Sequence, residues 1–387
     1  MAFFVSFSEY SLRLIFMQLH LFNPENDLAL ANGDPNFVAP TSARRLARDL
    51  AALPIWWSEP EDLILIGGKT DHWAEVQACA PWGWSPEVKN RFLKLGINES
   101  LLPDEQQLEH IRALSHRRTS IEIIRRLAED GSYPYELPAE PQELFSIADV
   151  DSFIRTMDSV VLKTPWSSSG KGLCWSDQVN SFNREQWLKP VFKKIGSVVG
   201  ERVYEKILDF AMIFSAQADG SVVFAGYSLF DTDTKGAYQG NRLLSNEAIE
   251  AILSDYVALS QLCQLERSLI RILSDSISSA YIGYLGVDMM ICQTASGYLL
   301  HPCVELNLRM TMGAVARLFY DKHTCGGEGR FRIIYQARKG ALYDHFLQQE
   351  LTPAEWEGEK LKSGTLLLTP VDRYTHYVAI AEMDPAL

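Results

Sequence analysis

Paired cysteines and long apolar runs are both missing from this chain of 387 residues. Its six cysteines lie far apart and form no C-x-x-C pair, so neither a zinc knuckle nor a disulfide framework is indicated. We expect reduced thiols in a cytoplasmic protein. Because no run of about 20 apolar residues is present, no transmembrane helix is predicted.

Basic charge is scarce as well. The chain has 36 Lys and Arg against 49 Asp and Glu, a formal net charge of -13. Nucleic acids and anionic membranes need a basic protein surface, so neither is expected as the main partner. What is present, 47% apolar and 22% charged residues without repeats, is typical of a globular protein with two or three domains.

The first 16 residues resemble a signal peptide only in being apolar. Glu9 and Arg13 interrupt the apolar stretch, no basic segment precedes it, and no small-residue cleavage site follows. Since Met17 opens a strand-like segment, we expect residues 1–16 to be a non-native or disordered extension.

Strand and helix patterns alternate from residue 17 to about residue 115. A strand in QLHLF, a helix over about 41–52, a strand in LILIGG and a helix over about 86–95 predict a small doubly wound βα domain. Further along, strands are expected over 159–163 and 197–208, and one long helical stretch over 247–278. The fold class is therefore α/β.

The segment VVLKTPWSSSGKGLCW uses the residues of phosphate binding without being a P-loop. Pro165 stands where a P-loop needs Gly, and Gly172 stands where it needs the Ser or Thr that holds magnesium. Lys163 projects from the strand before the loop, and its ammonium suits phosphate oxygens. We predict a flap that folds over a polyphosphate, with a mobile surface turn as the alternative. The flap residues are Ser167, Ser168, Ser169, Gly170, Lys171 and Gly172.

A hairpin is predicted in YLGVDMMICQTASGYLLHPCVELNLRM, with Ser296-Gly297 as its two-residue turn. This register places Asp288 directly opposite Glu305. Asn307 and Arg309 then share the face of Glu305, because strand side chains alternate between faces. Two opposed carboxylates destabilise a sheet unless something neutralises them. Carboxylate and amide oxygens suit magnesium, although an ion network with Arg309 or a lysine is the alternative.

Between these two segments, EKIL ends a strand-like run. Backbone groups at such a position can hydrogen-bond an adenine edge, with Leu208 beside the ring. Glu205 and Lys206 fit equally well as a solvent-facing ion pair on a core strand.

In this order the pieces resemble the ATP-grasp superfamily, and the local patterns of biotin carboxylase look closest. SHRRTSIEII resembles the basic residue at a helix start, with Arg117 where a lysine is usual. LKTPWSSSGKGL resembles the strand lysine and its flap, EKIL the adenine hinge, and VD with ELNLR the magnesium and substrate motif E-x-N-x-R. The resemblance covers residues 115–313, about half of the chain.

The resemblance implies an ATP-grasp fold with a Rossmann-like βα domain before it. Its expected parts are a βα domain over 17–115, an N-lobe with the flap over 116–208, a C-lobe with the magnesium site over 209–330, and a C-terminal segment over 331–387 that packs on the C-lobe. The implied ATP contacts are Arg117, Lys163, the flap residues, Glu205, Lys206 and Leu208. The implied magnesium ligands are Asp288, Glu305 and Asn307, and Arg309 would face the reacting phosphoryl group or the acceptor carboxylate.

The resemblance further implies an ATP- and magnesium-dependent ligase that joins a carboxylate to an amine, or less often to a thiol. A phosphotransferase and a nucleotide-binding module without turnover remain alternatives. Two polar loops are candidates for binding the small-molecule substrates: the first contributes Asn23, Glu25 and Asp27, and the second Gln239, Asn241 and Arg242. For both loops, an ordinary surface loop is the alternative.

Overall fold

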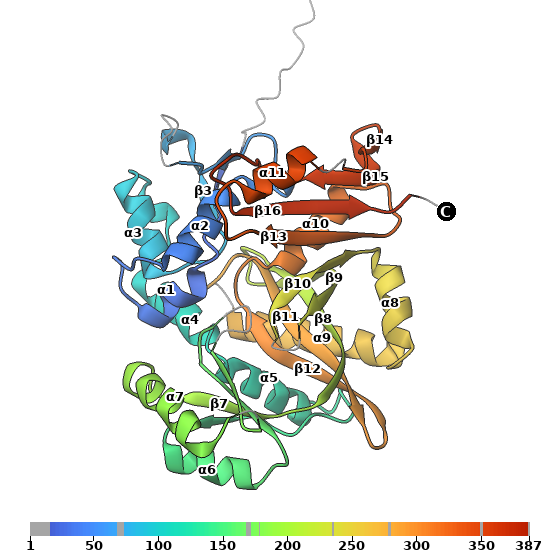
Figure 1. Cartoon of the computed structure of the whole chain (residues 1–387). Helices are drawn as coiled ribbons and strands as arrows, with labels where there is room; N and C mark the ends of the chain where they lie inside the picture. The colour runs from blue at the N-terminus through green and yellow to red at the C-terminus, as the bar shows by residue number, and fades with distance from the viewer. Residues whose placement is uncertain are drawn as a thin grey trace, which may run out of the picture.

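A computed structural model describes residues 16–67, 73–167, 172–177, 179–233, 236–277, 280–348 and 351–385. Its strands form three sheets, of three, nine and four strands (Figure 1). Among the helices of these residues, none combines the length and apolar character needed to cross a membrane. The predicted α/β class is confirmed.

The N-terminal sheet is parallel, in the order β2-β1-β3. Its strands β1, β2 and β3 are Gln18–Leu21, Leu63–Ile64 and Ala78–Pro81. The helices of this part are α1 Asn26–Asn32, α2 Thr41–Asp49, α3 Pro86–Lys94 and α4 Glu105–Leu114, with short 3-10 helices at Leu53–Trp56, Trp73–Glu75 and Glu99–Leu101. Loops that follow β1 and β3 leave the same edge of the sheet, because both strands run in one direction.

The four-stranded sheet has the order β4-β7-β5-β6 and lies with α6 and α7 at one end of the molecule (Figure 1). Its strands are β4 Gln142–Leu144, β5 Val160–Lys163, β6 Leu173–Trp175 and β7 Val198–Arg202. The helices α6 Ile147–Arg155 and α7 Ser181–Lys194 supply Val150, Phe153 and Leu188 to a core shared with the strands. This small lobe therefore has its own hydrophobic core.

The nine-stranded sheet is antiparallel, in the order β12-β11-β8-β9-β10-β13-β16-β15-β14. Its first five strands are β8 Glu205–Ala216, β9 Val222–Thr232, β10 Tyr238–Leu243, β11 Gly283–Thr294 and β12 Gly297–Asn307. The others are β13 Gly329–Tyr335, β14 Glu355–Glu357, β15 Lys360–Leu367 and β16 Tyr377–Met383. Strands β13 to β16 thus extend this sheet beyond β10.

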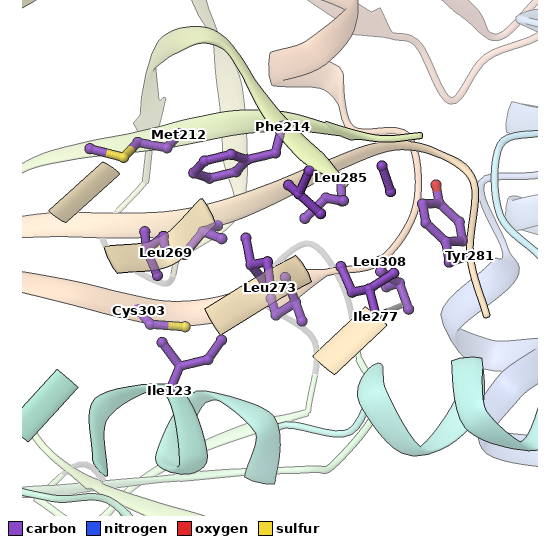
Figure 2. Close-up of a cluster of buried hydrophobic side chains, with 14 of the residues drawn as sticks. Ile123, Met212, Phe214, Leu269, Leu273, Ile277, Tyr281, Leu285, Cys303 and Leu308 are labelled. Carbon is purple, nitrogen blue, oxygen red and sulfur yellow. The ribbon is translucent and has the colours of Figure 1, made fainter. Parts of the chain in front are cut away.

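Helices cover this sheet on both faces. Leu269, Leu273 and Ile277 of α9 pack against Met212 and Leu285 of the sheet, and Ile123 of α5 closes the same core (Figure 2). On the other face, α10 carries the buried Ala314 and Phe319. The bounds are α5 Arg118–Glu129, α8 Asn246–Ser254, α9 Leu259–Ile277, α10 Met312–His323 and α11 Ala341–Gln348.

Two expected elements are divided in the structure. The helical stretch over 247–278 consists of α8 and α9, which are separated at residues 255–258. The strand expected over 197–208 consists of β7, in the four-stranded sheet, and β8, in the nine-stranded sheet. The chain therefore crosses from one lobe to the other at Val203 and Tyr204, because only these two residues separate the strands.

Candidate functional site

The hairpin of β11 and β12 places Asp288 opposite Glu305, as the sequence predicts. The predicted turn is wrong, however. Thr294 pairs with Gly297, so the turn residues are Ala295 and Ser296, and the pairing near the turn is displaced by two residues from the predicted register. An irregularity between Asp288 and Met290 restores the predicted register.

That irregularity lies mainly on β12. The three residues between His301 and Glu305 stand opposite the single residue Met289 of β11. β12 therefore holds two extra residues there. Pro302 is one of the three, and its lack of an N–H fits a position where the ladder is interrupted. The predicted pair is therefore correct although its turn was not.

The carboxyl group of Asp288 is strongly affected by its position. Burial, followed by repulsion from Glu305, raises the pKa of Asp288 to about 7. Asn307 Nδ2 donates to Asp288 Oδ2 at 3.0 Å, which favours the charged form. Burial also raises the pKa of Glu305, against the attraction of Arg117. These two acids and one amide are oxygen ligands of the kind that magnesium takes.

Arg117 links this face to the root of the flap. Its Nη2 lies 3.1 Å from Glu305 Oε2 and 3.3 Å from Ser167 Oγ, and its Nε donates to the carbonyl of Thr164 at 3.1 Å. The alternative of an ion network is thus realised in part, with Arg117 rather than Arg309 as the partner of Glu305. Within the described ranges, no group of three or more His, Cys, Asp or Glu is placed to hold a metal ion.

A backbone hydrogen bond joins the two ends of the flap. Thr164 N–H donates to the carbonyl of Gly172 at 2.9 Å. Gly172 has a φ of 77°, and a Cβ there would collide with Thr164 Oγ1, so only glycine fits. Ser167 is buried. The other predicted flap residues, Ser168, Ser169, Gly170 and Lys171, lie outside the described residues.

Lys163 forms a buried ion pair that the sequence did not predict. Its Nζ lies 2.5 Å from Glu201 Oε2, across β5 and β7. The other carboxylate oxygen of Glu201 is buried without a hydrogen-bond partner, and so is Nδ1 of His301 nearby. In the pairing of β5 with β7, Glu201 lies diagonally opposite Lys163. The sequence analysis did not predict that these two strands pair, so it could not predict the ion pair.

Arg309 joins the nine-stranded sheet to the N-terminal domain. Its Nε and Nη2 donate to the carboxylate of Asp27 at 3.0 and 2.8 Å, in a bidentate pair. Burial would lower the pKa of Arg309, but Asp27, Glu305 and Asp288 raise it. Gly83, after β3, lies so close that a Cβ there would come within 3.0 Å of the Cβ of Arg309. Arg309 therefore lies where the loops after β1 and β3 meet the hairpin.

The first candidate substrate loop is partly structural. Asn23 is buried and exchanges hydrogen bonds with the backbone of Gly83. Glu25 differs, because its Oε2 is buried without a partner. Glu87, at the start of α3, has an unpartnered buried oxygen too. Burial is the main cause that raises the pKa of each of these acids, and Glu87 adds repulsion on Glu25.

The second candidate loop lies largely on β10. Asn241 is buried and engaged, because it accepts from the hydroxyl of Tyr238 and donates to Ser228 Oγ at 2.7 Å. Gln239 is exposed. Arg242 Nη2 lies 3.8 Å from Glu328 Oε2. Asn241 thus stabilises the sheet, whereas Gln239 and Arg242 remain accessible.

The predicted adenine residues begin β8, beyond the crossing between the lobes. Glu205 and Lys206 are exposed, and Leu208 is half-buried. Lys206 Nζ lies 2.5 Å from Asp209 Oδ2 and also contacts Thr232 Oγ1. The ion pair of Lys206 is therefore with Asp209, four positions after Glu205.

No protein-family model matches the sequence, and no curated protein matches it either. Solved structures do match, over nearly the whole chain. Biotin carboxylase of Campylobacter jejuni in its β-γ-ATP complex has a TM-score of 0.54 at 11% identity, over 94% of this chain and 87% of that chain. The biotin carboxylase domain of Hydrogenobacter thermophilus 2-oxoglutarate carboxylase, with MgADP, has 0.51 at 13%, over 95% and 86%. An N5-carboxyaminoimidazole ribonucleotide synthetase with ADP has 0.50 at 10%, over 96% and 93%.

Proposed function

Because the chain has the ATP-grasp fold, we propose that it is an ATP- and magnesium-dependent ligase. In this reaction a substrate carboxylate oxygen attacks the γ-phosphorus of ATP, and ADP leaves. An amine then attacks the carbonyl carbon of the acyl phosphate, phosphate leaves and the amine loses a proton. A thiol is the less common second nucleophile. The reaction needs no nucleophilic side chain, since catalysis depends on positioning and charge.

The observation that carries the proposal is the pair Asp288 and Glu305, with Asn307 beside them. Their positions on two strands of a rigid sheet hold three oxygen ligands on one face. A raised pKa at both acids is what two buried carboxylates show when no cation neutralises them fully. Magnesium bound there would neutralise phosphate charge, and these residues fit it because magnesium takes a few carboxylates and fills its remaining positions with phosphate oxygens and water.

The cationic residues around this face would hold the phosphates. Lys163 projects from β5 and Arg117 from the start of α5, and both lie beside the flap root. Binding of a phosphate would require Lys163 to share its charge between Glu201 and the ligand. Arg309 is held by Asp27 with part of its guanidinium directed to Met310 O, so it is oriented before any substrate binds.

The adenine of ATP and the two substrates would occupy the remaining parts of the site. We assign the adenine to the crossing between the lobes, with Glu205, Lys206 and Leu208 at its C-terminal side. Glu25 is the best candidate of the first loop for an ammonium group, because its buried oxygen lacks a partner. Gln239 and Arg242 are the accessible candidates for the carboxylate substrate.

The test is ADP release measured over a panel of carboxylates and amines with MgATP. The proposal expects release that depends on adding a carboxylate together with an amine, and loss of that release in Arg309→Ala. Release that depends on an acceptor alone, with stable phosphorylated product, would instead identify a phosphotransferase.

One observation favours a nucleotide-binding module without turnover. Arg117 already neutralises Glu305 at 3.1 Å, so a cation is present on the metal face before any metal binds. Tight MgATP binding without acceptor-dependent ADP release, over the same panel, would support this second candidate. No MgATP binding at millimolar concentration would contradict both.

A further inference from the structure

A cavity of about 750 Å³ lies outside the face that carries Asp288 and Glu305. It is bounded by the end of α4, the outer side of α5, the segment that leads into β4, and the end of α9. Its floor includes the apolar side chains of Ile121, Ile123 and Ile272, all of them buried in the protein. This volume is within the range of pockets that hold small organic molecules.

Some of the charged residues that line the cavity form ion pairs or hydrogen bonds, and one does not. Arg125 is neutralised by Glu140 at 2.6 Å and by Glu122 at 3.6 Å. Glu143 accepts from Ser197 Oγ at 2.6 Å and lies 3.4 Å from Nε2 of His116. Arg118 is exposed, and among the described residues its guanidinium has neither an ion pair nor a hydrogen bond. The cavity therefore has one cation to offer to a ligand.

A second cavity of about 290 Å³ adjoins the first. Ala113, Arg118 and Glu143 line both, and the second cavity extends to Trp166. Trp166 donates from its Nε1 to the carbonyl of Arg112 at 3.1 Å, lies under the guanidinium of Arg112, and makes an edge-to-face contact with His116 at 4.7 Å between ring centroids. A molecule that occupies both cavities would contact Trp166 as well as Arg118.

Trp166 connects this surface to the root of the flap. It directly precedes Ser167, whose hydroxyl and carbonyl both lie near Arg117 Nη2. Arg117 in turn directly precedes Arg118 and contacts Glu305. A displacement of Trp166 would therefore move Ser167, its neighbour in the chain. A displacement of Arg118 would move Arg117 in the same way.

We propose that the two connected cavities form a binding site for a small organic anion with an apolar body, and that its occupancy is communicated to the flap root through Trp166. The apolar body would cover Ile121 and Ile272, and the anionic group would pair with Arg118. The guanidinium groups of Arg118, Arg112 and Arg117 all act on His116, which lines the second cavity, so an anionic group beside Arg118 would be attracted by all three. The lining carboxylates of Glu122 and Glu140 are paired with Arg125, and Glu109 lies 3.9 Å from Arg112.

The binding test uses 8-anilinonaphthalene-1-sulfonate, which carries one sulfonate on an apolar aromatic body and fluoresces when that body leaves water. We expect one saturable site in the full chain. Arg118→Glu removes the cation, and Ala113→Phe fills the passage that both cavities share, so each should weaken binding at least tenfold. Arg155→Glu, on the exposed side of α6, makes the same change in charge elsewhere and should leave the affinity unchanged. Equal affinity in the wild type and in both cavity variants would overturn the proposal.

The communication test needs no nucleotide, so it is independent of the proposed function. The protein is labelled with 5-fluorotryptophan, and Trp166→Phe identifies the ¹⁹F resonance of Trp166. Saturation with the same probe should shift this resonance, and the shift should disappear in Arg118→Glu. A resonance that stays in place while the probe is bound would overturn the link to the flap root. Failure of MgATP binding would leave both results intact.

Discussion

Asp288 and Glu305 stand opposite each other because two irregularities in the same hairpin cancel. The turn at Ala295 and Ser296 displaces the pairing by two residues, and the two extra residues of β12 before Glu305 restore it. The acids are thus brought together by a bulge near the site, and bulges commonly redirect side chains at such positions.

The first prediction concerns this pair of acids. Asp288→Asn and Glu305→Gln should each weaken MgATP binding at least tenfold, because each removes one charged ligand of magnesium. The remaining binding should depend less on magnesium than in the wild type, which calorimetry at two magnesium concentrations would measure. Glu129→Gln, at the exposed end of α5, is the matched control. Wild-type affinity and magnesium dependence in both variants would contradict the metal assignment.

A second prediction follows from the raised pKa of Asp288. Since its carboxyl group has a pKa of about 7 in the folded protein, protons compete with magnesium below that pH. The magnesium dependence of nucleotide binding should therefore strengthen from pH 6 to pH 8. Asp288→Asn should flatten this profile, whereas an unchanged profile in the variant would assign the titration to another group.

The same shift predicts how folding stability varies with pH. The usual pKa of this group is 3.8, so between about pH 4 and pH 7 the folded state binds a proton that the unfolded state releases. The free energy of unfolding should fall as the pH rises through this window, and Glu305, whose pKa is also raised, should act in the same direction. Urea unfolding of the wild type and of Asp288→Asn at pH 4.5, 6 and 7.5 would measure the difference, which should shrink at low pH.

Lys163 and Glu201 allow a prediction that separates binding from stability. Lys163→Ala should abolish a phosphate contact and also leave the buried Glu201 without its partner, which costs about 3 kcal/mol or more. Adding Glu201→Gln should recover much of that stability without recovering nucleotide affinity. Thermal unfolding and calorimetry of the single and double variants would test this. If the double variant binds MgATP like the wild type, Lys163 is a structural residue only.

Asp27 is predicted to position Arg309. Asp27→Asn removes the bidentate acceptor, so Arg309 should lose its orientation while the nucleotide residues stay in place. Acceptor-dependent ADP release should fall at least tenfold, with MgATP affinity changed less than about threefold. Asp158→Asn is the control, because the side chain of Asp158 is 98% exposed. A parallel loss of affinity and turnover would show instead that Asp27 supports the whole site.

Local patterns were sufficient for much of the fold. The α/β class and the position of the flap root after Lys163 depend on alternation and spacing within short segments. The opposition of Asp288 and Glu305 was predicted correctly only because the bulge in β12 cancels the displaced turn, and neither of these was predicted. Side-chain pairs between segments that are distant in the sequence could not be predicted from it. The pairs Lys163 with Glu201, Arg117 with Glu305 and Arg309 with Asp27 depend on how separate elements pack, and the periodicity of one segment carries no information on that.

The crossing between lobes shows a second limit. The run SVVGERVYEKIL is apolar and alternating enough to predict one strand, and nothing in its composition marks Val203 and Tyr204 as a break. The break exists because β7 hydrogen-bonds to β5 while β8 hydrogen-bonds to β11, in different sheets. Only the choice of partners divides the run.

The continuation of the nine-stranded sheet beyond β10 protects the protein against aggregation. Asn241, Arg242 and Leu243 pair with β13, whose outer neighbour is β16. A chain cut before Gly329 would therefore uncover a row of unpaired backbone N–H and C=O groups along β10, next to the apolar side chains that α10 covers. Such an edge recruits strands from other molecules. The segment that begins at Gly329 thus protects the sheet that carries the site against self-association, in addition to completing its core.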